Sequence, residues 1–208
     1  MRALLRAKTV VLSLSAVAMI LACTAETTKQ DSTNTFVTVV SMQGLAGGVG
    51  GAADDELNSD VCGGTAFITG CSVAEDQCTV TMAAQPKNGI PTLGPSYLNN
   101  IVFNRYRVTY IRADGRNVAG LDVPYPFDGG MQLLVTADAT TSSASFVIVR
   151  VQAKLEPPLR NLAGDGGANV ISAVAEVDFY GTDNAGRNIT ARGYLNVHFA
   201  DWADVSSN

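Results

Sequence analysis

The stretch ISAVAEVDFYGTDNAGRNITARGYLNVHFA, residues 171–200, decides the fold class. Between residues 171 and 179 every second residue is apolar, and the same alternation returns over 189–199. The residues between the two runs, 182–186, include Asp, Asn and Gly, which favour turns. Two runs of period two joined by a short turn predict a β-hairpin with one buried face and one solvated face.

Upstream of this hairpin, the same period recurs and no segment sustains a helical period. The apolar phase switches near Asn104, which predicts a bulge or a sheet edge there. Pro124 and Pro126 confine residues 123–127 to an edge or to a path outside the sheets. The further strands that we expect are residues 36–42, 65–69, 79–83, 101–112, 131–137 and 145–155.

Seven to nine short strands with regular turn signals predict an all-β, antiparallel β-sandwich with long loops. This pattern resembles the immunoglobulin and fibronectin type of architecture, and it resembles it in fold only. Fold alone assigns no function, so any function must be argued from particular sites.

Composition and charge exclude several classes of protein. The chain has 208 residues, of which 47% are hydrophobic and 16% charged, so it is neither disordered nor fibrous. Residues 23–208 carry 11 basic and 19 acidic side chains, a net charge of −8. Such a surface repels phosphate backbones, and we therefore expect no nucleic-acid partner.

The N-terminus reads as a targeting segment. Residues 1–9 contain three basic side chains and no acidic one, and an apolar run follows over 10–21. This layout is typical of a secretory signal, and the apolar run is shorter than the roughly 20 residues that span a bilayer. The run ends in Ile20-Leu21-Ala22-Cys23, which resembles the lipobox of bacterial lipoproteins.

This resemblance implies that residues 1–22 are a signal peptide and that Cys23 becomes an acylated N-terminus. Anchors with more than one acyl chain hold a protein stably on a membrane. Thr24 stands where an Asp would imply retention at the inner membrane, so the resemblance implies the outer membrane of the cell envelope. Residues 23–35 are mostly polar and predict a flexible tether, with a single β-sandwich domain over 36–208.

The remaining cysteines are Cys62, Cys71 and Cys78. In an exported protein a disulfide is the default state of two thiols. Cys71 and Cys78 flank an expected hairpin loop, so we expect these two to pair; pairings of Cys62 with either remain open.

Two further sets of residues are candidates for binding. Acidic residues could hold calcium, which takes six to eight oxygen ligands; the candidates are Asp54, Asp55, Glu56 and Asp60. Aromatic residues could stack on sugar rings; the candidates are Tyr125, Phe127 and Trp202. Solvated turns and anchoring of loops to the core are the simpler interpretations of both sets. No other cofactor is expected.

No catalytic residues are predicted. His198, the single histidine, falls on the polar phase of the last strand, and no nucleophile or metalloprotease motif accompanies it. We therefore expect a lipid-anchored envelope protein that binds or scaffolds an envelope protein or a glycan without catalysis. The alternatives are a surface glycan-binding or glycan-cleaving lipoprotein, a carboxylate-based hydrolase included, and a subunit that self-assembles through an edge strand.

Overall fold

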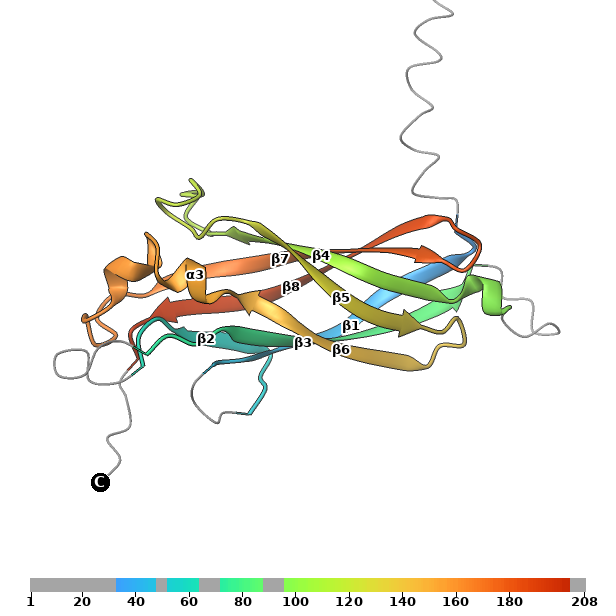
Figure 1. The fold of residues 1–208 in the computed structure, drawn as a ribbon, viewed down its shortest axis with the longest axis horizontal. Helices are drawn as coiled ribbons and strands as arrows, with labels where there is room; N and C mark the ends of the chain where they lie inside the picture. Colours follow the sequence, from blue (N-terminus) through green and yellow to red (C-terminus); the bar gives the residue numbers. More distant parts are fainter. Residues whose placement is uncertain (1–32, 48–51, 64–71, 88–95, 203–208) are drawn as a thin grey trace, which may run out of the picture.

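The computed structural model of the chain describes residues 33–47, 52–63, 72–87 and 96–202. In these residues eight strands form two sheets that lie face to face (Figure 1). The strands are β1 (Thr35–Leu45), β2 (Glu56–Asp60), β3 (Asp76–Pro86), β4 (Ile101–Ile111), β5 (Phe127–Val135), β6 (Thr141–Val149), β7 (Ile171–Asp183) and β8 (Asn188–Ala200). The short helices are η1 (Tyr97–Asn99), α3 (Val151–Lys154) and η2 (Leu159–Leu162).

The first sheet has the order β1-β3-β6 and the second the order β2-β8-β7-β4-β5. Every neighbouring pair is antiparallel except β2 and β8, which are parallel. The expected all-β sandwich is therefore confirmed.

The hairpin predicted from residues 171–200 is β7 and β8, paired without interruption from Ile171 opposite Phe199 to Thr182 opposite Asn188. Its apolar phase points inward, and Val177, Phe179 and Val197 are fully buried. This face is buried against the first sheet, which removes a large apolar area from water. Each Å² of apolar area buried stabilises the fold by about 25 cal/mol.

The switch of phase near Asn104 is a register irregularity in β4. Both ladders of this strand, with β5 and with β7, shift between Phe103 and Arg105. The extra residue shifts the alternation of side chains between the two faces of the sheet. Phe103 and Tyr106 are therefore both buried, although they are three positions apart.

Aromatic side chains fill the space between the two sheets. Phe146 of β6 contacts the rings of Tyr106 and Phe179 at centroid distances of 4.6 and 5.4 Å. The Tyr106 hydroxyl donates a hydrogen bond of 3.0 Å to the carbonyl of Val147, and the Tyr110 hydroxyl donates to the carbonyl of Ile148. These bonds join β4 to β6 across the sandwich and satisfy the buried phenols.

Three predictions about strands differ from the structure. β2 was not expected, because its inward-facing Ser59 interrupts the apolar alternation. The expected strand 145–155 ends at Val149, and the chain turns into α3, which buries Lys154. The expected strand 131–137 begins earlier, at Phe127, directly after the two prolines. The expected strand 65–69 lies outside the described residues.

In the part of the chain that the structure describes, we find no helix with the length and apolarity needed to cross a membrane.

Candidate functional site

The loop between β4 and β5, residues 112–126, carries a dense network of polar contacts. It leaves β4 at the end of the sandwich opposite to the start of β1 (Figure 1). The other end of β4 is fixed beside β1, because the Thr35 hydroxyl donates to the carbonyl of Asn99 at 3.5 Å. About eleven residues of strand separate the two ends, which is roughly 35 Å.

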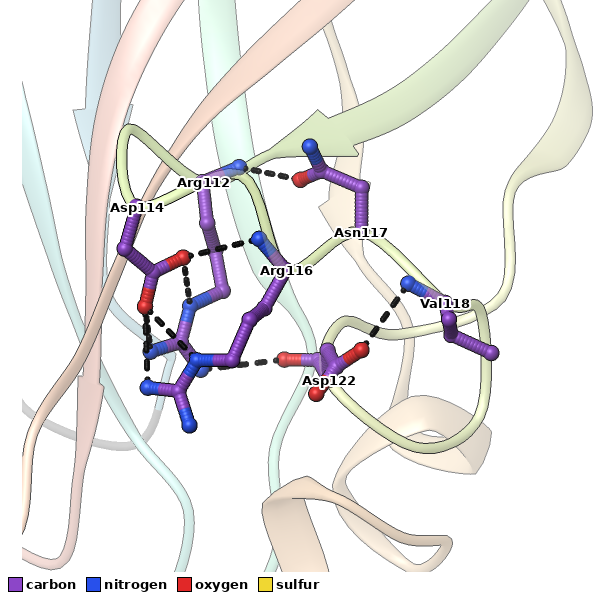
Figure 2. A network of polar contacts seen from close by, with 6 residues as sticks. All are labelled: Arg112, Asp114, Arg116, Asn117, Val118 and Asp122. Carbon is purple, nitrogen blue, oxygen red and sulfur yellow. Dashed lines mark hydrogen bonds and ion pairs between the residues drawn. The ribbon is translucent and has the colours of Figure 1, made fainter.

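A carboxylate organises the first half of this loop. Asp114 accepts hydrogen bonds from the Arg112 guanidinium at 2.6 and 3.2 Å, and from the Arg116 backbone and guanidinium at 3.1 and 3.0 Å (Figure 2). These donors lower the pKa of Asp114 to about 2, with the Arg112 side chain as the largest cause. The carboxylate is therefore charged at neutral pH and fixes both arginines over the turn.

Two further side chains fix the second half. The Asn117 side-chain carbonyl accepts from the Arg112 backbone N–H at 2.6 Å, and the Asp122 carboxylate accepts from the Val118 N–H at 3.1 Å (Figure 2). Gly120 has φ +78°, and a Cβ built there would lie 2.3 Å from the Tyr125 hydroxyl oxygen. Only glycine therefore lets Tyr125 lie against this turn.

The fixed loop exposes three apolar side chains. Val118, Leu121 and Tyr125 are 59%, 70% and 54% exposed. All three belong to one loop. The polar network provides hydrogen-bond acceptors for backbone N–H groups of this loop and so restricts its conformations. Large exposed apolar patches mark sites that contact a partner, and these three side chains, exposed on one loop, are the candidate for such a site. We call these three residues the loop tip.

The aromatic candidates separate in the structure. Tyr125 is exposed on the loop tip, whereas Phe127 is buried, packed beside Tyr106 with the Arg150 guanidinium 4.2 Å above its ring. Trp202 follows β8, and its backbone N–H donates to Asp60 at 3.1 Å. Its indole nitrogen is buried without a hydrogen-bond partner. Phe127, being buried, offers no ring face to a sugar.

The calcium candidates lie just before β2 and at its two ends. Asp54 accepts from the Asp55 N–H, Glu56 lies on the exposed face of β2, and Asp60 accepts from the Cys62 and Trp202 N–H groups. Among the described residues no group of three or more His, Cys, Asp or Glu side chains is placed to hold a metal ion.

The expected bridge between Cys71 and Cys78 is wrong, because Cys78 is a free, fully buried thiol. Burial raises the pKa of Cys78 to about 12. Cys62 is disulfide-bonded. Cys71 and Cys23 lie outside the described residues, so the pairing of Cys62 with Cys71 stays a prediction.

His198 lies on the solvated face of the second sheet, as its phase predicts. Its Nδ1 is 2.9 Å from the Ser172 hydroxyl, and its Nε2 is 3.5 Å from a Glu56 carboxylate oxygen. These three residues come from β8, β7 and β2, which are neighbours in one sheet. The contacts form a cross-strand polar row on an open face.

A second carboxylate network, fully buried, was not found from the sequence. Asp76 accepts from the Gly47 N–H at 2.7 Å, the Ser59 hydroxyl at 2.6 Å and the Lys154 ammonium at 2.8 Å. Both side chains of the Asp76–Lys154 ion pair are 0% exposed. The signal in the sequence is Ser59 and Lys154, two polar residues at positions where a period-two pattern predicts apolar side chains.

No protein-family model matches the sequence, and no curated protein matches it either.

Proposed function

We propose that this protein is a lipid-anchored binding module of the bacterial cell envelope, which holds the loop tip away from the membrane to dock on another envelope protein. The observation that carries the proposal is the position of three exposed apolar side chains, Val118, Leu121 and Tyr125, on a loop fixed by Asp114 and Asp122. No catalytic chemistry enters this proposal.

The position of the first strand supports the proposed tethering. Thr33, the first described residue, leads into β1 at the end of the molecule opposite to the loop tip (Figure 1). Cys23 precedes it by ten residues, a contour length of about 35 Å. An acylated Cys23 would therefore keep the β1 end near the bilayer and leave the loop tip facing outward.

The chemistry of the loop tip favours a protein partner over a bilayer or a glycan. Two aliphatic side chains and a tyrosine, on a loop that also contains Arg112 and Arg116, match the composition of protein interfaces, where aromatic residues and arginine are enriched. The net charge of −8 over residues 23–208 opposes contact with anionic headgroups.

A photo-crosslinking residue tests the docking surface in intact cells. We expect position 121 to form a discrete crosslinked product, and position 134 on β5 to form none. Leu134 is the matched control, because it is also an exposed leucine, 50% exposed. Equal products from both positions, or none from position 121, would contradict docking through the loop tip.

The anchor has its own test. Membranes should retain the wild-type chain, and a Cys23→Ala variant should appear in the soluble fraction. Acyl mass on a chain that begins at residue 23 is the expected result of intact mass measurement. An unmodified chain that begins elsewhere would end the tethering proposal, and soluble glycans would then become the ligands to test through Trp202 fluorescence.

Self-assembly through an edge strand is a second candidate, favoured by one observation. Strands β1 and β6 are the edges of the first sheet, and neither contains a charged residue. Edge strands usually carry charges that prevent pairing between copies. Sedimentation that rises with protein concentration would support this function, and a concentration-independent monomer would exclude it.

A further inference from the structure

The buried ion pair between β3 and α3 joins two groups that can condense. Lys154 Nζ and Asp76 Oδ1 are 2.8 Å apart, and neither side chain has any exposed area. Charged side chains are almost never fully buried unless they are paired, since removing an ammonium and a carboxylate from water costs several kcal/mol each. The described chain has one other lysine, Lys87, which lies over the Phe36 ring.

The surroundings of the pair suit acyl transfer to an amine. The second carboxylate oxygen, Oδ2, accepts a hydrogen bond of 2.6 Å from the Ser59 hydroxyl, while Oδ1 accepts from the Gly47 N–H as well as from Lys154. A donor on each oxygen polarises the carboxyl carbon and stabilises negative charge that develops on Oδ2. The pKa of the buried Tyr110 phenol is raised, first by burial and then by the charge of Asp76.

We propose that Lys154 and Asp76 form an intramolecular amide bond, which covalently links α3 to the start of β3. Lys154 Nζ first gives a proton to Oδ1, which converts the buried ion pair into a neutral amine and a carboxylic acid. The nitrogen lone pair then attacks the Asp76 carboxyl carbon, and the π electron pair moves onto Oδ2, where Ser59 donates.

The tetrahedral species then loses water. A second proton passes from Nζ to Oδ1, the bond between the carboxyl carbon and Oδ1 breaks, and its electron pair leaves with the water molecule. The C=O bond to Oδ2 re-forms. One amide and one water are the products, and no oxidant or other reactant is consumed. Well-oriented groups in one molecule react with effective molarities of about 10⁵ M and above, so holding Nζ against the carboxyl group accelerates the attack.

The proposed amide would lie at the end of the sandwich that carries loop 112–126. Both α3 and the start of β3 lie at that end, because Asp76 pairs with Val149 and β4 ends there also. An amide bond between α3 and β3 would restrain the end of the sandwich from which the loop tip projects.

Mass spectrometry of the full chain, denatured and reduced, tests the proposal. The matched control is Lys154→Arg, which keeps the positive charge but cannot form this amide. The substitution alone adds about 28 Da, whereas it adds about 46 Da if the wild-type chain has lost one water. The anchor mass cancels, because both chains carry the same N-terminus.

Peptide mapping locates the link and remains informative if the variant does not fold. We expect trypsin to leave wild-type segment 151–160 uncut after Lys154 and joined to segment 30–87, with the mass of one water missing. A loss of water confined to segment 30–87 would indicate a cyclised aspartate and overturn the proposal. Ordinary cleavage after Lys154, or a mass difference of about 28 Da between the chains, would overturn it as well.

Discussion

Asp114 and Asp76 each gather several hydrogen-bond donors, yet the two networks differ in where their donors come from. The partners of Asp114 are Arg112 and Arg116, two residues away on either side, and the cluster is exposed. The partners of Asp76 lie 29, 17 and 78 residues away along the chain, and the cluster is buried.

A carboxylate that accepts several hydrogen bonds therefore has a different role in each network. A local, exposed network shapes one turn, and water competes for each of its hydrogen bonds. A non-local, buried network joins β2, β3 and α3, and removing one member leaves an uncompensated charge in a dry site. The comparison predicts large losses of stability at Asp76 and mainly local effects at Asp114.

The largest effect is expected from Lys154→Met. This change removes both the ion pair and the proposed amide and leaves the Asp76 carboxylate buried without a partner, so the free energy of unfolding should fall by about 3–5 kcal/mol or more in urea denaturation. The control is Arg192→Met, which removes an arginine that also contacts two acids, Glu176 and Asp178, but is half exposed. Its loss should stay within about 1 kcal/mol, and equal losses from the two variants would break the comparison.

Cys62, which follows β2, is disulfide-bonded. Cys62→Ala should lower the free energy of unfolding by about 2–3 kcal/mol, the loop-closure entropy of a bridge over some ten residues. Cys78→Ala, which removes a free thiol, should cost about 1 kcal/mol. Alkylation of the denatured, unreduced chain should label Cys78 and spare Cys62 and Cys71. Labelling of Cys71 would contradict the pairing.

The same contrast explains what the sequence could predict. The β7–β8 hairpin and the irregularity at Asn104 depend on neighbours in the chain, and periodicity or turn chemistry identifies them. Strand β2 depends on Ser59 facing inward toward Asp76, and this requires a partner 17 residues away. Single-sequence patterns contain no information about such pairs.

The candidate sites follow the same division. Tyr125 was identified as a loop aromatic and is exposed, but Val118 and Leu121 were not singled out, because an apolar residue in a loop has no periodic signal. The helix α3 replaces an expected strand because Lys154 reaches Asp76 only after the chain turns away from β6. Tertiary constraint overrides local propensity at these residues.

A smaller effect is expected from two glycines of the loop. Gly115→Ala and Gly120→Ala each place a side chain at positive φ, 80° and 78°, which costs about 1–2 kcal/mol. Only the methyl group introduced by Gly120→Ala would collide with the Tyr125 phenol; nothing lies within 4 Å of a Cβ at Gly115. We therefore expect Gly120→Ala to abolish the crosslink from position 121 and Gly115→Ala to keep it. Loss in both variants would mean that turn strain alone disrupts the loop.

The smallest effect on global stability is expected from protonation of Asp114. Its pKa is lowered to about 2 by the Arg112 side chain and by Arg116. The ordinary value is 3.8, so the network is fully formed above about pH 4 and is lost as the pH falls through about 2. Amide NMR signals of residues 112–118 should follow this transition.

Asp138 provides the internal control for that titration. Its pKa is also lowered to about 2, by hydrogen bonds from Thr136 and Thr140 in the turn between β5 and β6. Asp114→Asn should remove the acid transition at residues 112–118 and leave the one at residues 136–140 unchanged. Because both carboxylates are exposed, the urea midpoint at pH 7 should move little in this variant. A large shift in that midpoint would mean that loop 112–126 is part of the cooperative core, and that the local network, like the buried one, stabilises the whole sandwich.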